Sequence, residues 1–238
     1  MNLPPHLQPF VLPVEPRTAE RHGRADLYLP DDVARPCPAV VFVHGGPIPA
    51  EQRPTPRDWP VYQGYGSLCA ARGAVGATVD HRLHEVTGFP LAAADVAAAV
   101  EVARADPRVD EGRVALWFFS GGGLLMADWL RRPPQWLRCV AATYPVLAPP
   151  QDWDARFRPA DAVASADRLP IVLTRVGREQ QAVAAGVAAF VEAARQCQVR
   201  LEIIDVPNGR HGFDILDHTD ESMQAVLRAM DSVIATLT

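Results

Sequence analysis

The sequence predicts an α/β protein in which helices cover both faces of a mostly parallel sheet of about eight strands. Short apolar runs alternate along the chain with longer segments of helical period, as they do in βαβ units. The central runs are apolar at nearly every residue, which is typical of strands buried on both faces. Several runs stop at glycines or charged residues, and ligands of open α/β sheets bind at such strand ends.

Eight segments carry the pattern of strands. The first two lie in a proline-rich stretch, and the second alternates apolar and polar residues as a half-exposed edge strand does. The others are short apolar runs bounded by glycine, proline or charged residues. The predicted strands are 8–14, 23–29, 38–43, 74–79, 113–119, 139–144, 171–176 and 200–206.

Five segments carry the pattern of helices. Pro90 suits the first turn of one helix, Gly73 follows the end of another, and two prolines after Arg132 stop a third. The predicted helices are 62–72, 90–105, 121–132, 180–196 and a last one from residue 220 onward. Residues 145–168 have little period and are predicted to form a short lid or pocket wall. We therefore expect one domain, 1–238, with little or no cap.

Composition excludes several classes of function. The chain has 238 residues, 48% of them hydrophobic, and a formal net charge of −5 with no basic cluster, which argues against nucleic acid or an anionic membrane as partner. We see no secretory signal and no apolar run that approaches the roughly 18 residues of a membrane span. The four cysteines are far apart without a CxxC pair, so we expect reduced thiols in a cytoplasmic protein.

The chain is organised around a serine between a strand and a helix. The stretch 117–123 reads WFFSGGG, so that an apolar strand stops at Ser120 and three glycines follow. A serine at such a turn stands above the sheet edge with free backbone N–H groups around it, which is the arrangement of a nucleophile elbow. One feature departs from that pattern, because Phe118 occupies the place of its usual first glycine.

Two further residues could complete a catalytic set with this serine. A serine hydroxyl needs a base to remove its proton, and the base needs an acid to orient it. Glu179 and His211 follow later strands, so the chain order is nucleophile, acid, base. Glu179 is the weakest member, since a carboxylate that opens a helix is also favoured by the helix dipole. Asp152 and Asp154 are the reserve acids.

Together these motifs resemble the α/β-hydrolase-fold serine esterases, near the dienelactone-hydrolase and hormone-sensitive-lipase-like groups. The resemblance rests on four segments: HGG at 44–46, DHRL at 80–83 with Asp95 downstream, SGG at 120–122 and HGFD at 211–214. It implies a hydrolase that cleaves a small carboxylic ester without a cofactor or metal. Ser120 would form the acyl-enzyme, His211 would act as base and Glu179 as acid.

The resemblance also implies an oxyanion hole. Its donors would be the N–H of Gly121 and an N–H from the loop that holds Gly45 and Gly46, with Gly46 favoured because Pro47 has no N–H. His44 is expected to brace this loop, and Asp80 with Arg82 resembles a structural pair. Four aromatic residues could line a substrate pocket or simply pack in the core: Trp59, Tyr62, Trp153 and Phe157.

The sequence leaves three alternatives open. Phe118 and the unusual acid are also compatible with a non-catalytic α/β-hydrolase-fold protein that binds a small molecule. A thioesterase or peptidase would use the same site, because specificity depends on the pocket rather than on the fold. The acyl chain length and a homodimer are equally undecided by sequence.

Overall fold

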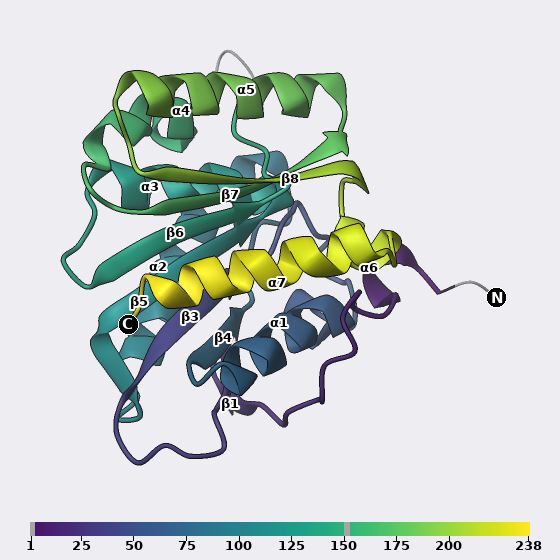
Figure 1. The fold of residues 1–238 in the computed structure, drawn as a ribbon, viewed down its shortest axis with the longest axis vertical. Helices are drawn as coiled ribbons and strands as arrows, with labels where there is room; N and C mark the ends of the chain where they lie inside the picture. Colours follow the sequence, from purple (N-terminus) through teal and green to yellow (C-terminus); the bar gives the residue numbers. More distant parts are fainter. Residues whose placement is uncertain (1–2, 150–152) are drawn as a thin grey trace.

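The computed structural model describes residues 3–149 and 153–238, and within them eight strands form one sheet (Figure 1). The strand order is β1-β2-β4-β3-β5-β6-β7-β8. The pairs β1–β2 and β2–β4 are antiparallel, and all pairs from β4 through β8 are parallel. The strands are β1 (Glu20–His22), β2 (Ala25–Tyr28), β3 (Cys37–Val43), β4 (Val75–Val79), β5 (Val109–Phe119), β6 (Leu137–Thr143), β7 (Ile171–Arg178) and β8 (Leu201–Arg210).

Helices cover the two faces of this sheet, each with its own apolar cluster. One face carries α1 (Pro60–Ala71) and α7 (Asp220–Ala235) in front of the sheet in Figure 1. The other carries α2 (Phe89–Arg104), α3 (Met126–Arg131) and α5 (Gln181–Gln196). The mostly parallel, two-faced sheet predicted from the sequence is thereby confirmed. The remaining short helices are α4 (Pro159–Ala162), α6 (Phe213–Leu216), η1 (Pro5–Leu7), η2 (Pro56–Asp58), η3 (Val86–Gly88), η4 (Ser120–Leu125), η5 (Ala155–Phe157) and η6 (Val163–Ser165), where η denotes a 3₁₀ helix.

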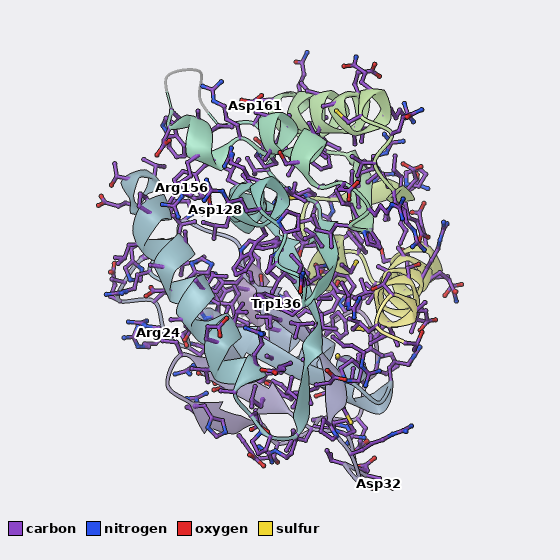
Figure 2. The ribbon with its side chains drawn as sticks, turned by 90° about the vertical axis from the view of Figure 1, so that its left-hand side faces the viewer. Arg24, Asp32, Asp128, Trp136, Arg156 and Asp161 are labelled. Atoms are coloured by element: carbon purple, nitrogen blue, oxygen red, sulfur yellow. The ribbon has the colours of Figure 1, made fainter. Side chains whose placement is uncertain are left out.

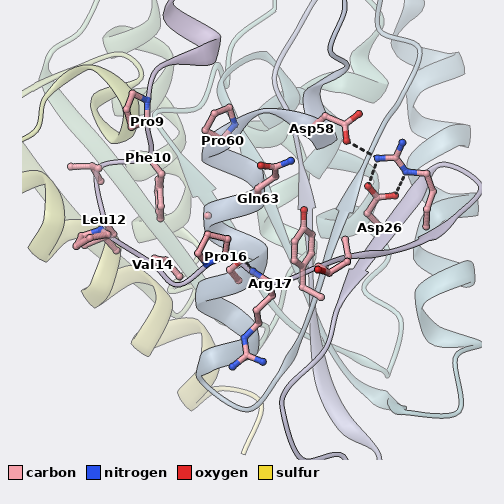
Figure 3. A pocket seen from close by; sticks show the side chains of 18 of the residues that line it. Pro9, Phe10, Leu12, Val14, Pro16, Arg17, Asp26, Asp58, Pro60 and Gln63 are labelled. Carbon is pink, nitrogen blue, oxygen red and sulfur yellow. Dashed lines mark hydrogen bonds and ion pairs between the residues drawn. The ribbon is translucent and has the colours of Figure 1, made fainter.

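The N-terminal segment departs from the prediction. Residues 8–14 are not a strand; they cross α1 as an extended strap, with Phe10, Val11 and Leu12 buried in the cluster beneath α1 and α7. The strap and α1 border an open pocket of about 810 Å³ whose lining contains no residue of the predicted catalytic set (Figure 3). The Val11 N–H donates to the carbonyl of Asp214 (2.8 Å), so the strap is tied to α6, which begins two residues after His211.

The strand predicted at 23–29 forms as β2, but it is not a half-exposed edge. A short polar strand, β1, pairs outside it, and all four residues of β2 are buried. The polar residue of its alternating pattern, Asp26, is only 2% exposed. Its carboxylate pairs with Arg21 (2.8 Å) and Arg57 (3.2 Å), and these ion pairs compensate for its burial. Buried charges occur when they are paired in this way. β1 itself carried no apolar signal in the sequence.

One apolar stretch is longer than predicted, since the sequence analysis expected no run as long as a membrane span. Residues 86–104, which comprise η3 and α2, are long and apolar enough to span a membrane by length and composition. In the structure α2 packs on the sheet, and Ala92, Val96 and Ala103 on its inner face are fully buried. Its apolar character on that face is accounted for by this core packing.

Of the segment predicted as a lid or wall, 145–168, the structure describes residues 145–149 and 153–168, and the second part packs against α3. Phe157, Ala162 and Val163 are buried in the cluster beneath α2, α3 and α5. An ion pair between Arg156 and Asp128 (2.6 Å) joins it to α3 at the surface (Figure 2). This segment therefore extends the apolar cluster between α3 and α5.

Candidate active site

The serine lies at the tight turn that the sequence predicts. β5 ends at Phe119, and Ser120 has a φ of 48°, in the left-handed region that non-glycine residues rarely adopt. Its carbonyl accepts the N–H of Val146 (2.8 Å), which fixes the turn against the chain after β6. The following segment begins as the 3₁₀ helix η4 and becomes α-helical only at Met126, rather than at residue 121 as predicted.

Phe118 is accommodated without loss of this turn. It lies in register between Val43 of β3 and Ala142 of β6, is fully buried, and belongs to the cluster beneath α2 and α3. Phe119 belongs to the cluster on the opposite face. Since adjacent strand residues point to opposite faces, the Phe118 ring fills the core below the elbow.

The three residues of the predicted catalytic set form one hydrogen-bonded chain. Ser120 Oγ lies 2.7 Å from His211 Nε2, and His211 Nδ1 lies 2.6 Å from Glu179 Oε2. The network assigns the proton on Nδ1 to donate to the carboxylate, which leaves Nε2 to accept the serine hydroxyl. The His211 side chain is 34% exposed, whereas that of Glu179 is 5% exposed, so the set opens to solvent at the histidine.

A bulge between β7 and β8 positions the glutamate. The register of the pair shifts between Val176 and Arg178, and a Cβ on Gly177 would lie 2.1 Å from the Pro207 carbonyl oxygen. β7 thereby ends one residue before Glu179, whose second carboxylate oxygen accepts the N–H of Gln180 (2.8 Å). Of the reserve acids, Asp154 instead caps η5 by accepting the Arg156 N–H, and Asp152 lies outside the described residues.

The predicted oxyanion donors differ in what their N–H groups already bind. The Gly45 N–H donates to the hydroxyl oxygen of Tyr62 (3.4 Å). The Gly46 N–H has no partner among the residues that the structure describes. Gly121 is the second residue of η4, so its N–H is one of the first-turn donors that have no partner within a helix. Gly46 and Gly121 thus remain the donors available to a ligand.

The loop and the elbow approach each other very closely. A Cβ on Gly121 would lie 2.1 Å from the Gly46 carbonyl oxygen, and a Cβ on Gly45 would lie 2.8 Å from the Cβ of Ser120. Such distances leave no room for a side chain at either position. Glycine at positions 45 and 121 therefore allows the loop to approach the elbow this closely, which sets the spacing between the candidate donors Gly46 and Gly121.

Two stacked histidines brace the loop from behind. The rings of His44 and His81 are 3.6 Å apart and nearly parallel, and both residues are almost fully buried. His81 Nε2 donates to the His44 carbonyl (2.9 Å), and the His81 backbone N–H donates to His44 Nε2 (3.3 Å). Burial lowers the pKa of His44 well below its usual value and that of His81 to about 4. The bracing role expected of His44 fits this geometry.

Asp80 and Arg82 do not pair with each other, contrary to the expectation. Asp80 pairs with Arg57 (3.0 Å), and Arg82 pairs with Asp95 (2.6 Å) on α2. Both partners lie on other elements, Arg57 in η2 and Asp95 on α2, so closeness in sequence did not predict them.

The four aromatic pocket candidates lie in different surroundings. Tyr62 is 6% exposed at the oxyanion loop, and Trp59 packs against it with ring centroids 6.2 Å apart. Trp153 and Phe157 both pack against Phe89, and Phe157 is 2% exposed. Phe157 is therefore a core residue, and pocket lining by Trp59 and Trp153 stays a prediction.

The sequence analysis missed a buried acid beside this site. Asp214 is fully buried and accepts hydrogen bonds from Tyr65 and Tyr144. In the sequence Asp214 is the last residue of the HGFD motif, three residues after His211. No local pattern indicated its partners, which lie on α1 and after β6.

The strand order and the hydrogen-bonded serine, histidine and glutamate at the carboxyl edge of the sheet define the class: this is an α/β-hydrolase fold. Residues 25–128 match the family model described as BD-FAE. A search of curated proteins finds no significant sequence match.

Solved structures of similar fold include two esterases and a peptidase. A thermophilic esterase, Est2 of the Planctomycetes species Thermogutta terrifontis, aligns with a TM-score of 0.68 and 20% identity, over 89% of this chain and 86% of that one. A bacterial heroin esterase aligns with a TM-score of 0.73 and 19% identity, over 90% and 79%. Dipeptidyl peptidase 4 of Porphyromonas gingivalis gives 0.67 and 18%, over 89% and 33%. These likenesses confirm the predicted fold and the resemblance to α/β-hydrolase esterases.

Proposed function

We propose that this protein is a serine hydrolase that cleaves a small carboxylic ester through an acyl-enzyme. The observation that carries the proposal is the continuous chain from Ser120 Oγ through His211 to Glu179, with distances of 2.7 and 2.6 Å. Nucleophile, base and acid are then within hydrogen-bond reach, as acyl transfer by a serine requires.

In the first half of the reaction, Ser120 Oγ attacks the ester carbonyl carbon while His211 Nε2 takes the hydroxyl proton. The carbonyl oxygen becomes an oxyanion, and the N–H groups of Gly46 and Gly121 are the proposed donors to it. Glu179 holds the imidazole in its tautomer and stabilises the imidazolium. Collapse of the intermediate breaks the bond to the alcohol oxygen, which receives the proton from Nε2.

In the second half, water replaces the alcohol. His211 Nε2 takes a proton from water, whose oxygen attacks the acyl carbon of the Ser120 ester. The second tetrahedral intermediate collapses with the serine oxygen as leaving group, and Nε2 returns the proton to it. The products are a carboxylic acid and free enzyme, so no cofactor is consumed.

The names of the structural neighbours support this choice of chemistry. Two are named esterases, and structures of Thermogutta terrifontis esterase 2 are described as phosphonylated by sarin and phosphorylated by paraoxon. By analogy, we expect an organophosphorus reagent to modify Ser120. The peptidase among the neighbours makes an amide the second candidate class of substrate.

The experiment compares the wild-type protein with Ser120→Ala, using p-nitrophenyl esters of graded acyl length and a fluorophosphonate probe. We expect turnover of the shorter esters, one labelled serine, and loss of both in the variant. Folded wild-type protein that neither turns over any ester nor reacts with the probe would instead support the non-catalytic binding protein. Turnover of peptide amides in preference to esters would assign a peptidase.

We also propose a cytoplasmic location, because the four cysteines are far apart in the sequence and form no CxxC pair. All four cysteines are free thiols in the structure, and Cys69 and Cys139 are buried. Fractionation of cells that express the chain, with thiol labelling before and after reduction, would test both points.

A further inference from the structure

The ring of Tyr144 packs against the His211 ring in a tilted arrangement. Tyr144 follows β6 directly, is 7% exposed, and its ring centroid lies 4.9 Å from that of His211 at an interplanar angle of 55°. The same ring contacts Phe119, the residue before Ser120, with centroids 6.1 Å apart, and Phe213 at 5.8 Å. Tyr144 therefore lies between the strand that carries the nucleophile and the loop that carries the base.

The hydroxyl of Tyr144 is anchored on a buried carboxylate. It lies 2.9 Å from each oxygen of Asp214, and Tyr65 donates to one of them (3.1 Å). Asp214 and Tyr65 are both fully buried. In the described part of the chain, the side-chain partners of this carboxylate are these two phenols and no cation. A buried acid without a cation is costly, and burial raises the pKa of Asp214 to about 7.

The backbone at Tyr144 is also held in an unfavourable conformation. Its φ is 37°, in the left-handed region that is unusual for a bulky residue. The Tyr144 N–H donates to the Thr174 carbonyl (2.8 Å), so neighbouring β7 fixes this turn. Unfavourable backbone conformations of this kind cluster at active sites, where the surrounding structure maintains them. Two costly features, the backbone and the buried acid, thus hold one ring in place.

The imidazole needs such a contact because its hydrogen bonds restrain one motion only weakly. The bonds to Ser120 and Glu179 hold the ring at Nε2 and Nδ1, and they restrain a roll about the axis through these two atoms least. His211 is followed by Gly212, whose φ is 79°, and its side chain is 34% exposed. A ring packed against the imidazole, as that of Tyr144 is, restricts this roll.

We infer that Tyr144, anchored through its hydroxyl on Asp214, is a positioning residue that holds the His211 imidazole in the plane where it faces both Ser120 and Glu179. The expected loss of kcat rests on the proposed function, ester hydrolysis. The contacts of Tyr144 with His211 and Asp214 do not depend on it.

The chain offers a matched pair of variants for the test. Tyr144→Phe and Tyr65→Phe each remove one phenol hydroxyl from the same carboxylate, but only Tyr144 contacts the His211 ring. Both replacements keep the ring and are expected to fold. We expect Tyr144→Phe to lower kcat for p-nitrophenyl acetate about tenfold with little change in KM, the pattern of a misoriented base. Tyr65→Phe should change kcat less than about twofold for the same loss of one buried hydrogen bond.

A proton NMR measurement distinguishes failure of this inference from failure of the proposed function. The proton shared by His211 Nδ1 and Glu179 should give a downfield proton resonance, assigned by its loss in Glu179→Gln. We expect Tyr144→Phe to broaden or shift it and Tyr65→Phe to leave it unchanged. If the wild type hydrolyses no ester but the resonance still responds to Tyr144 alone, the positioning role stands and the ester hydrolase does not. Equal effects of the two variants, or none, on both kcat and the resonance would overturn the inference.

Discussion

Replacement of Asp214 by asparagine should change how the stability of this protein depends on pH. In the folded protein the pKa of Asp214 is about 7, against an ordinary value of 3.8, because the carboxyl is buried. Between pH 4 and 7 the folded state therefore holds a proton that the unfolded state has released. The free energy of unfolding falls with rising pH wherever the folded state binds more protons. The wild type should accordingly lose stability from Asp214 as the pH rises through this window, and lose no more above it.

The size of the effect follows from the difference between the two pKa values. They differ by roughly three, and each unit corresponds to about 1.4 kcal/mol, which gives about 4 kcal/mol between pH 4 and pH 7. Asparagine does not titrate, so the Asp214→Asn variant lacks this term. Its stability relative to the wild type should therefore rise by about 4 kcal/mol across the same interval.

The wild-type profile alone would not reveal this slope, because the buried histidines oppose it. Burial lowers the pKa of His81 to about 4, so the unfolded state binds its proton first as the pH falls below about 6.5. The contribution of His81 to the free energy of unfolding is complete above that pH and is lost as the pH falls toward 4. The contribution of Asp214 changes with pH in the opposite direction. The difference between wild type and variant at each pH removes the histidine contribution.

The assay is urea unfolding followed by the fluorescence of the five tryptophans, at intervals from pH 4.5 to 8.5. Asp231→Asn is the control, because Asp231 is a surface carboxylate whose side chain is 59% exposed. We expect the Asp214→Asn difference to grow with pH and the Asp231→Asn difference to change little. Parallel wild-type and Asp214→Asn profiles would refute the reasoning, since Asp214 would then carry the same charge in both states.

Three further variants probe the candidate site. Gly121→Ala should lower kcat by about 10²–10³, because a Cβ there would lie 2.1 Å from the Gly46 carbonyl and displace one oxyanion donor; ester kinetics measure it. Glu179→Gln should lower kcat by about 10⁴, because an amide no longer holds the imidazole in its tautomer, and the rate of fluorophosphonate labelling should fall with it. Phe118→Ala should cost about 3–5 kcal/mol in urea unfolding but leave kcat nearly unchanged, because the ring is buried beneath the elbow rather than at the reacting atoms.

Each of these predictions has a control and a contrary outcome. Gly112→Ala, where the nearest atom to a new Cβ is 3.4 Å away, should leave kcat unchanged, and equal losses would argue against the donor role of Gly121. Glu192→Gln on the exposed side of α5 is the control for the acid, and retention of full activity by Glu179→Gln would exclude that role for Glu179. A rise in kcat for Phe118→Ala would mean that Phe118 impairs the elbow.

The sequence was most informative for strands that are buried on both faces. Apolar runs located the parallel strands within a few residues, because a strand covered on both faces has no polar positions. It failed at β1, which is three polar residues long and pairs only at the edge. It also failed at residues 8–14, where apolar side chains are buried by a strap whose prolines lack the N–H that a strand would use.

The sequence was sufficient to predict the three residues of the candidate site but not the contacts that hold them in place. Chain order and strand ends were sufficient to nominate Ser120, Glu179 and His211, because polar residues at one sheet edge converge. The placement of Glu179 depends on the bulge at Gly177, for which the sequence offers only an isolated glycine after an apolar run. The link between Tyr62 and the Gly45 N–H joins a helix to a loop, and such tertiary partners leave no periodic trace in a sequence.

The hydrogen bond from the Val11 N–H to the Asp214 carbonyl has a consequence for how the chain can be shortened. Residues 8–14 form neither helix nor strand, and an engineer trimming the protein to its regular elements would remove them first. A chain that begins after Leu12 would keep the serine, the histidine and the glutamate intact. It would lose one hydrogen bond that ties the N-terminal strap to α6, the helix that begins two residues after His211, so the support of the proposed base includes residues that precede the first strand.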